Sequence, residues 1–355
     1  MPQTTFMMIQ NEVKVTHAIL QIIAELDEFK GSWKQLRFLS PDLLNSLREV
    51  ATIESVGSST RIEGAKLSNS EVEKLLSGLS AHSFSSRDEE EVAGYADAMK
   101  TVSESFNEIS LTENHIKQLH AMLLKHSSKD TRHRGEYKKF ANHVEAFDKK
   151  GKSLGIIFET TSPFDTPQKM TELVELTIKT LSEKELHPLI AIAIFIVHFL
   201  AIHPFQDGNG RLSRILSTLL LLRSRYEYVP YASLEAVIEA NKDDYYLSLR
   251  KTQRTFNTSR HHIEPWLMFF LHVLKAQKDN LNQNIERGKG LLDLPALSRQ
   301  LLELTKLQGH LTLSMATKSI EANERTIRDH IQRLVKDGYL AKHGERKGTF
   351  YTLAL

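Results

Sequence analysis

Residues 203–214, HPFQDGNGRLSR, place an imidazole, a carboxylate, two glycines and two guanidinium groups in one short turn. His203 titrates near neutral pH and can take a proton from an attacking hydroxyl group. Asp207 supplies the hard oxygen ligand that suits Mg²⁺ shared with a nucleotide. The residue types and their order predict phosphate chemistry, with His203 as catalytic base and Asp207 as metal ligand.

The segment Gly208-Asn209-Gly210 opens an amphipathic helix. Glycine allows close approach of a ligand to the backbone, and the N-terminal end of a helix favours an anion. Arg211 and Arg214 lie three residues apart on one face and can hold phosphate oxygens. A plain helix–turn–helix joint explains the glycines, but not the histidine, aspartate and paired arginines together. We therefore predict that the segment Gly208-Asn209-Gly210 binds nucleotide together with Arg211 and Arg214.

The composition is that of a globular protein with a hydrophobic core. Hydrophobic residues make up 41% of the 355 residues, and the net charge of +2 does not favour binding of nucleic acid by the whole chain. The absence of cysteine excludes disulfides, thiol nucleophiles and cysteine-based zinc sites. No signal-peptide pattern is seen, and the apolar run at 189–202 is too short to cross a bilayer. These features predict a cytoplasmic protein without membrane contact.

Helical periodicity predicts the elements that position the turn. The run from Pro188 to the turn is apolar all round and should be an enclosed helix. Upstream, Ser40-Pro41 should begin a helix that reaches towards residue 57 and the segment SSTRIEGAKLS. Within 142–160, apolar residues flank the turn-rich centre DKKGK, which predicts a β-hairpin. His198 and the histidines at 115, 120 and 126 lack metal-ligand spacing and are expected in the core or on the surface.

The turn resembles the signature of the Fic family, H-[PF]-F-x-[DE]-G-N-G-R-x-x-R, with every fixed position filled. The resemblance implies transfer of AMP from ATP to a Ser, Thr or Tyr hydroxyl of a protein, with release of pyrophosphate. It implies that His203 is the general base and that Asp207 holds Mg²⁺ between the α- and β-phosphates. Arg211 would bind the β-phosphate side and Arg214 the γ-phosphate.

Ser59, Glu63 and Gly64 resemble the family's inhibitory motif, [ST]-x-x-x-E-[GN], in the upstream position of its second class. The resemblance implies that Glu63 pairs with Arg214, so that ATP binds in an unproductive pose. A solvated serine and glutamate at a helix end are the alternative. The segment ANKDDYYLSLRKTQ resembles the part of the fold that closes the adenine pocket, which assigns Asn241 to the nucleoside and Tyr245 to the base. Aromatic residues on such helices are also common core residues.

The hairpin at 142–160 resembles the Fic flap, which presents the hydroxyl of a target segment, and a structural hairpin is the alternative. Its exit, FETTSPF, departs from the pattern of relatives and leaves the target side chain open. The resemblance implies a protein substrate along this hairpin. We also expect that the protein can modify itself and that it can form a homodimer.

The final residues, 294–355, have the pattern of three helices and two strands and resemble a winged helix-turn-helix domain. DNA binding through 323–355 would use basic residues of the third helix and the wing, namely Arg325, Arg328, Arg346 and Lys347. The alternative is a module for protein interaction or dimer packing.

The expected fold is mainly α: a Fic helical bundle with a small β-hairpin flap, followed by the winged helix-turn-helix domain. The expected parts are an N-terminal helical region with the inhibitory motif (1–85), a Fic catalytic core (86–275), a linker (276–293) and the winged-helix domain (294–355). Three rival functions stay open. They are removal of AMP at the same site, a DNA-binding regulator that senses nucleotide, and a Doc-like phosphotransfer, which the intact signature disfavours.

Overall fold

The computed structural model describes residues 13–36, 41–78, 84–142, 144–147, 153–256, 258, 261–292, 294–345 and 348–354. Three predicted features lie outside these residues: the helix cap Ser40, the hairpin turn at 148–152, and the wing residues Arg346 and Lys347. The described chain is mainly helical, as predicted, and divides into two compact units, residues 1–281 and 282–355.

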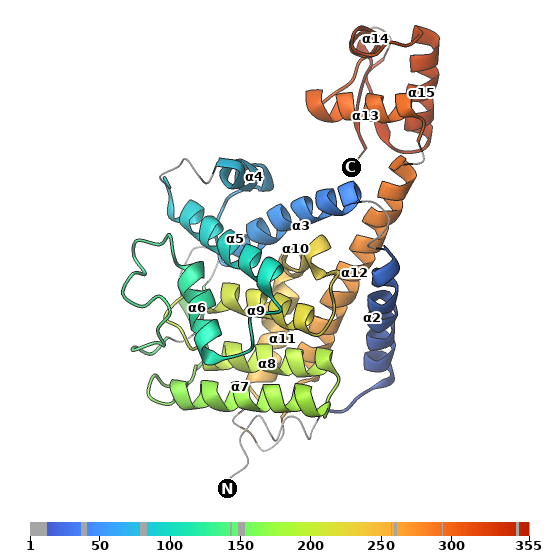
Figure 1. Cartoon of the computed structure of the whole chain (residues 1–355). Coiled ribbons are helices and arrows are strands. Elements are labelled where there is room, and N and C mark those ends of the chain that lie inside the picture. The colour runs from blue at the N-terminus through green and yellow to red at the C-terminus, as the bar shows by residue number, and fades with distance from the viewer. Residues whose placement is uncertain are drawn as a thin grey trace. The chain divides into compact units, whose positions relative to one another are not determined.

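The first unit is a bundle of helices with one pair of short strands (Figure 1). Its elements are α2 (His17–Leu36), α3 (Pro41–Ile62), α4 (Asn69–Gly78), α5 (Arg87–Ser105), α6 (Glu113–Leu123), β1 (Val144–Phe147), β2 (Ser153–Phe158), α7 (Thr166–Glu183), α8 (Pro188–Ile202), α9 (Asn209–Arg223), the 3-10 helix η1 (Val229–Tyr231), α10 (Leu234–Ala240), α11 (Lys242–Gln253) and the greater part of α12 (Glu264–Leu292).

Helix α8 is the core of this unit. All of its residues after Pro188 are buried, because the sequence offers no polar face to solvent. It lies between α7 and α9, and α11 also contacts it (Figure 1). Trp266 of α12 donates its indole N–H to the Ala193 carbonyl of α8 at 2.7 Å. The helix that leads into the signature turn is therefore held on several sides.

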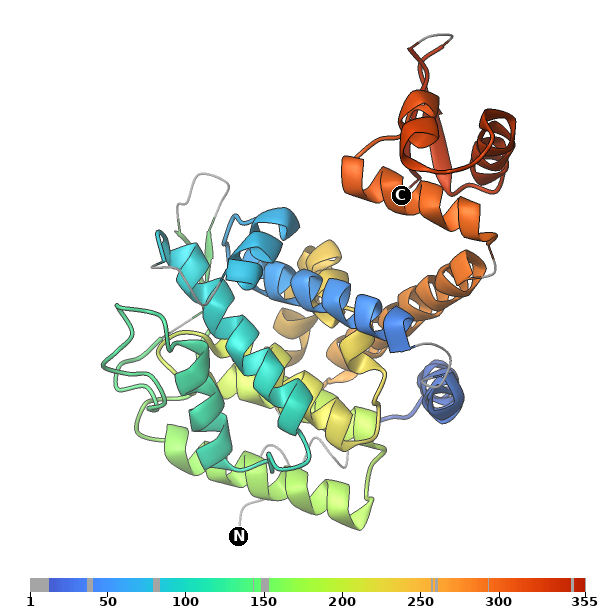
Figure 2. The same cartoon turned by 45° about the horizontal axis from the view of Figure 1, so that its top comes forward.

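The predicted inhibitory residues lie at the end of helix α3: Ser59 is on its last turn, and Glu63 and Gly64 follow it directly. The helix lies alongside α5 and also contacts α10 and η1 (Figure 2). Arg61, near its end, forms a two-pronged ion pair with Glu239 of α10, with N–O distances of 2.7 and 2.9 Å. Gly64 then turns the chain with a φ of 109°, which favours glycine. The end of α3 is thus fixed against α10.

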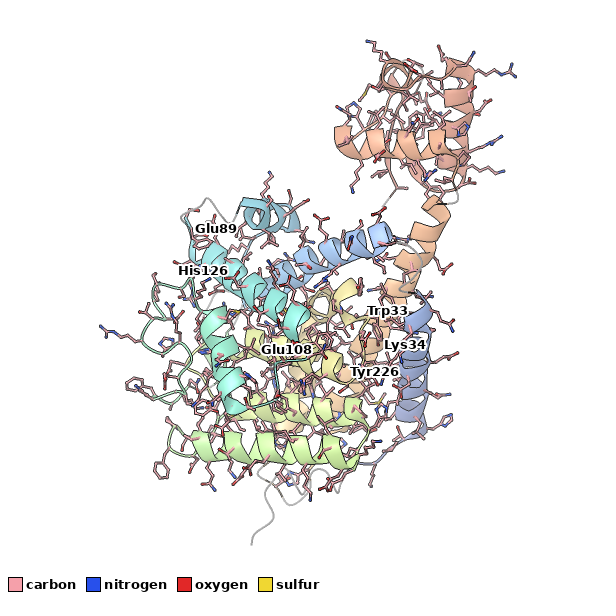
Figure 3. The ribbon with its side chains drawn as sticks, viewed as in Figure 1. Trp33, Lys34, Glu89, Glu108, His126 and Tyr226 are labelled. Atoms are coloured by element: carbon pink, nitrogen blue, oxygen red, sulfur yellow. The ribbon has the colours of Figure 1, made fainter. Side chains whose placement is uncertain are left out.

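Helix α2 docks through a cluster of aromatic side chains. Trp33 and Tyr226 both lie where α2 meets the bundle (Figure 3). Tyr226 donates to Asp27 of α2 at 2.6 Å, and the ring of Phe29 meets that of Tyr228 edge-on at 5.0 Å. These contacts bury the apolar face of α2 and leave its other face exposed.

Strands β1 and β2 pair antiparallel, with Glu145 opposite Ile156 and Ala146 opposite Gly155. The hairpin predicted over 142–160 is present as this pair of strands. Thr160, just beyond β2, donates its hydroxyl to the Asn142 carbonyl at 2.8 Å, which closes the base of the hairpin.

The second unit has its own hydrophobic core, formed by eight buried residues: Leu301, Leu302, Leu311, Ala316, Ile327, Ile331, Leu334 and Leu340. Its elements are α13 (Ala296–Gln308), α14 (Leu313–Ser319), α15 (Glu324–Lys336), β3 (Leu340–His343) and β4 (Phe350–Leu353), and the two strands pair antiparallel. As predicted, Asn323 caps α15 by accepting from the Arg325 N–H at 2.9 Å. The order of elements is the predicted one, while the winged-helix assignment and DNA binding stay predictions.

The predicted linker at 276–293 is helical in the structure. Residues 276–292 continue α12 without a break, and the division between the two units falls after Leu281. The polar composition of this segment reflects a helix with several exposed positions. None of the described helices has the length and apolar character needed to cross a membrane.

Candidate functional site

The signature turn joins α8 to α9 through two residues with positive φ. His203 ends α8 with a φ of 53°, and Gly208 precedes α9 with a φ of 80°. Asn209 is buried, and its side chain accepts from the Phe205 N–H at 2.9 Å and donates to the Phe205 carbonyl at 2.7 Å. The Asn209 amide is therefore used to hold the turn closed, which leaves its backbone for a ligand.

Glu63 lies over the start of α9. A Cβ atom at Gly210 would collide with the Glu63 carboxylate, so only glycine leaves room for this group. The first N–H groups of a helix have no intrahelical partner and favour a negative charge. The Glu63 carboxylate thus occupies the position in which an anionic ligand is predicted.

Arg214 holds this carboxylate from the next turn of α9. Its Nη2 lies 2.8 Å from Glu63 Oε1, and it also donates to the Ser59 side chain at 2.8 Å and the Ser59 carbonyl at 2.9 Å. The Arg214 side chain is 2% exposed, and its Nη1 has no hydrogen-bond partner among the described residues. Burial opposes the charged form, but the Glu63 carboxylate and the nearby hydroxyl groups of Tyr245 and Tyr95 together outweigh it and raise the pKa of Arg214. The predicted pairing of Glu63 with Arg214 is present.

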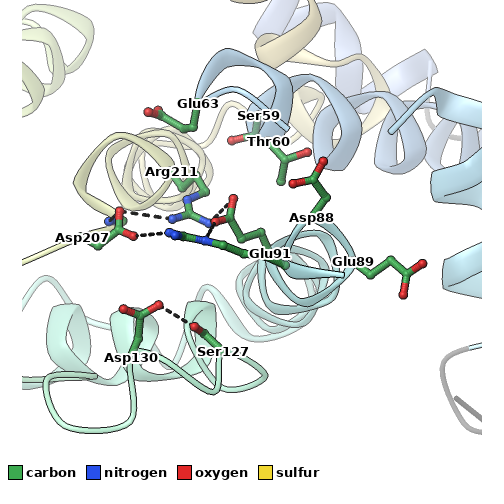
Figure 4. Close-up of polar contacts among 12 residues, drawn as sticks. Ser59, Thr60, Glu63, Asp88, Glu89, Glu91, Ser127, Asp130, Asp207 and Arg211 are labelled. Atoms are coloured by element: carbon green, nitrogen blue, oxygen red, sulfur yellow. Dashed lines mark hydrogen bonds and ion pairs between the residues drawn. The ribbon is translucent and has the colours of Figure 1, made fainter. Parts of the chain in front are cut away.

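A second group of charges surrounds Asp207 (Figure 4). Arg211 approaches Asp207 Oδ1 at 3.4 Å and Glu91 Oε2 at 2.9 Å. Arg87 approaches Asp207 Oδ2 at 2.9 Å and Glu91 Oε1 at 2.7 Å. The four side chains form a closed ring of alternating charge, with two members from α5 and two from the signature. We call it the α5–signature ring.

Asp207 is ionised in this ring. Partial burial acts to raise the pKa of its carboxyl, but Arg211, the Gly208 N–H and Arg87 act more strongly and lower it. No cluster of three or more acidic, histidine or cysteine side chains suited to a metal occurs in the described part of the chain. A metal at Asp207 would take its other ligands from phosphate and water, which is how Mg²⁺ is often held beside a nucleotide. The site fits Mg²⁺ in that form.

His203 is neutral in the structure. Burial, aided by the charge of Lys138, lowers its pKa to about 4. Its Nδ1 lies 3.3 Å from the Leu200 carbonyl, which can only accept, so Nδ1 carries the proton. This leaves the lone pair of Nε2 for a substrate proton, as the predicted role of base requires.

Lys138 holds the turn in a way that the sequence did not predict. Its backbone N–H donates to the Pro204 carbonyl at 2.8 Å. Its buried ammonium donates to the Asn142 side chain and the Thr160 hydroxyl, both at 2.9 Å, and to the Ile202 carbonyl at 3.0 Å. Burial lowers the pKa of Lys138 to about 8. This lysine joins the base of the hairpin to the end of α8, next to His203.

His120 of α6 packs against the signature turn. Its Nδ1 accepts from the Gly135 N–H at 2.9 Å, so its Nε2 carries the proton and donates to the Asp207 carbonyl at 3.0 Å. Its ring stacks on Phe205 at 3.8 Å. Burial lowers the pKa of His120 to about 4. The sequence left open whether this histidine lies in the core or on the surface, and it gave no sign that His120 contacts the signature.

The two residues predicted for the nucleoside are placed differently from each other. Asn241 lies between α10 and α11 and donates its side chain to the Val237 carbonyl at 2.8 Å. Tyr245 is 4% exposed, and its ring packs against Trp266 and Phe269 at about 6 Å. Tyr245 therefore does not present a free ring face to a base in this structure. The two nucleoside roles stay predictions.

Comparisons with known proteins agree with this geometry. Residues 110–221 match the model of the Fic/DOC family. The chain is 40% identical over 72 residues to a Fido domain-containing protein of Dictyostelium discoideum, covering 20% of this chain and 46% of that protein. It is 29% identical over 185 residues to the protein adenylyltransferase Fic of Drosophila melanogaster, covering 52% of this chain and 35% of the relative. The matches thus span less than half the length of these relatives.

The fold is also found among solved structures. A Fic family protein from Desulfovibrio desulfuricans superposes with a TM-score of 0.59 at 21% identity, over 96% of this chain and 97% of that chain. At this identity the likeness concerns the fold alone. The family model and the structural neighbours together support a Fic/Fido family protein.

Proposed function

We propose that this protein transfers AMP from ATP to a Ser, Thr or Tyr hydroxyl of a protein, and that Glu63 inhibits the transfer. The observation that carries the proposal is the position of the Glu63 carboxylate, over Gly210 and paired with Arg214. This position is an anion site beside a neutral histidine. The relatives named as protein adenylyltransferases support the same reaction.

In this proposal the triphosphate binds at the start of α9. The backbone of Gly208, Asn209 and Gly210 contacts phosphate oxygens, Arg211 holds the β-phosphate side, and Arg214 holds the γ-phosphate. Asp207 would hold Mg²⁺ between the α- and β-phosphates, where the ion neutralises phosphate charge. The γ-phosphate and Glu63 compete for Arg214, so ATP binds productively only when Glu63 leaves.

His203 serves as the general base. Its Nε2 takes the proton of the target hydroxyl as the hydroxyl oxygen forms a bond to the α-phosphorus. The bond from that phosphorus to the bridging oxygen of the β-phosphate breaks, and pyrophosphate leaves. The phosphates of bound ATP bring negative charge close to the imidazole and raise its pKa from the low value of the free protein, which strengthens it as a base.

The target segment would add to the edge of the β1–β2 hairpin. Lys138 fixes the hairpin base to the end of α8, so a segment paired with the hairpin is held in register with His203. The protein itself serves as a substrate when no other is supplied.

The experiment compares ATP labelled on the α-phosphate with ATP labelled on the γ-phosphate, using purified protein with Glu63→Gly and Mg²⁺. We expect label on the protein from the α-position only, with pyrophosphate as the released product. His203→Ala in the same background should abolish labelling of the protein. Label from the γ-position with release of ADP would replace the proposal with phosphotransfer, and loss of AMP from a pre-modified target would favour the reverse reaction.

A further inference from the structure

Arg87 is the exposed member of the α5–signature ring. Its guanidinium lies 2.9 Å from Asp207 Oδ2, and the side chain is 50% exposed. Asp207 is the carboxylate to which the proposed function assigns the metal. Arg87 therefore places a positive charge on the one carboxylate of the signature, from a helix more than a hundred residues earlier in the chain.

The two arginines of the ring differ in their freedom to move. Arg211 is 3% exposed in its side chain and is held by Glu91 at 2.9 Å. Arg87 is half-exposed and shares Glu91, with its Nε 2.7 Å from Oε1, one turn along the same helix. Because Glu91 stays within reach, Arg87 can leave Asp207 without becoming unpaired. The Arg211 side chain is buried and cannot swing out into solvent in the same way.

We propose that Arg87 is a positioning residue that occupies the cation place on Asp207 in the nucleotide-free protein and is displaced when metal and nucleotide bind. The inference rests on the proposed function, because it takes Asp207 as the metal ligand. Arg87 keeps the carboxylate ionised and oriented, and it competes with the incoming divalent cation. Its return to Asp207 favours release of the metal with the leaving pyrophosphate.

A direct contact between Arg87 and phosphate is the opposing interpretation. The two interpretations predict opposite effects of removing Arg87 on metal binding. If Arg87 competes with the metal, its removal strengthens metal binding. If Arg87 binds phosphate, its removal weakens binding of the metal–nucleotide complex. A merely structural role, as a partner of Glu91 on α5, leaves metal affinity unchanged.

The test measures free Mn²⁺ by electron paramagnetic resonance in titrations of the full chain carrying Glu63→Gly, with a non-hydrolysable ATP analogue present. We expect Arg87→Gln to lower the apparent Kd for Mn²⁺ about threefold to fivefold, as an exposed charge pair of this kind supports. Arg87→Lys, which keeps the charge, should stay within about twofold of the parent. An unchanged or higher Kd in Arg87→Gln overturns the proposal.

Two controls separate this inference from the proposed function. Arg225→Gln removes an exposed arginine that follows the other end of α9, about 20 Å along the helix, and should not change the Kd. Asp207→Asn should weaken Mn²⁺ binding. If Asp207→Asn and the parent bind Mn²⁺ equally, the metal assignment fails and the inference with it. If Asp207→Asn loses binding while Arg87→Gln changes nothing, only the inference fails.

Discussion

Glu63 Oε1 lies 2.8 Å from Arg214 Nη2, although the two residues are 151 positions apart. The contact places a carboxylate of α3 on the guanidinium that the proposed reaction needs for the γ-phosphate. Because Ser59 also accepts from Arg214 through its hydroxyl and its carbonyl, the arginine is oriented towards α3 on two sides.

Removing the carboxylate should activate the protein. We expect Glu63→Gly to raise self-labelling from α-phosphate-labelled ATP at least about tenfold, a change that corresponds to about 1.4 kcal/mol. Glu63→Gln, which keeps the size and loses the charge, should give an intermediate rate. Equal labelling by the wild type and Glu63→Gly would show that Glu63 does not inhibit.

Activation should carry a stability cost in the absence of nucleotide. Glu63→Gly leaves a buried arginine without its counter-ion, a change that costs several kcal/mol when fully buried and about 1–2 kcal/mol here because Glu63 is a third exposed. We expect a lower Tm by thermal unfolding, and a larger gain in Tm on addition of Mg²⁺ and ATP than the wild type shows. A variant with unchanged Tm would contradict this account of Arg214.

Gly210 tests the same contact from the other side. Gly210→Ala in the wild type should lower the Tm, because the new methyl group meets the Glu63 carboxylate. In the Glu63→Gly background the same change should be neutral or stabilising by up to about 1 kcal/mol, since alanine favours a helix over glycine. Thermal unfolding of the four proteins gives the coupling. Additive effects would show that the two residues do not touch.

Folding stability should depend on pH through the buried histidines. The pKa of His203 is about 4 in the folded protein and about 6.5 in an unfolded chain. Below pH 6.5 the unfolded chain binds a proton that the folded protein does not, so stability that is present above pH 6.5 is lost as the pH falls towards 4. The slope reaches at most about 1.4 kcal/mol per pH unit for one histidine.

The measurement is the Tm of the nucleotide-free protein between pH 7.5 and about pH 5, a range set by the histidine values. His203→Gln should flatten the decrease relative to the wild type. His262→Gln, at an exposed position, should leave it unchanged. His203→Gln with a slope as steep as that of the wild type would contradict the neutral state of the partly buried His203.

Lys138 offers a test of how the hairpin is anchored. Lys138→Met leaves three acceptors near His203 without their donor, and burial of unsatisfied groups costs about 1–3 kcal/mol. We expect a lower Tm. In the Glu63→Gly background we also expect the rate of AMP transfer to fall about tenfold, because misplacement of the hairpin that raises the activation free energy by about 1.4 kcal/mol gives that factor. The matched control is Lys139→Met, at the next and exposed position. Equal losses in both variants would remove the anchoring role.

The sequence predicted those parts of the site whose residues follow one another in the chain. The turn at 203–214 contains the histidine, the glycines and the arginines to which the proposal gives roles, so spacing and residue type were sufficient to single them out. Glu63 was predicted from its motif, and α8 from its apolar run. In each case the signal lies within one short segment and does not depend on how distant segments meet.

The remaining parts depend on tertiary contacts. Arg87 and Glu91 reach the signature from α5, and nothing in their local sequence separates them from other charged residues of that helix. In the sequence, nothing distinguishes Lys138 from the other basic residues near it. Tyr245 has a suitable residue type, but packing against α12 buries it. The sequence also did not show how far the helical part of the 276–293 segment extends, because polar exposed positions of a long helix resemble a loop in composition.

The ion pair between Arg61 and Glu239 bears on how the proposed inhibition by Glu63 would be relieved. It fixes α3 to α10 two residues before Glu63, and the Arg61 side chain also holds the Leu67 carbonyl at 2.9 Å beyond it. The backbone is therefore clamped on both sides of Glu63, while the glutamate side chain itself is a third exposed. If Glu63 inhibits as proposed, its release from Arg214 requires a change of side-chain rotamer, on a timescale of about picoseconds to nanoseconds, and not local unfolding of a helix, which takes about microseconds to seconds.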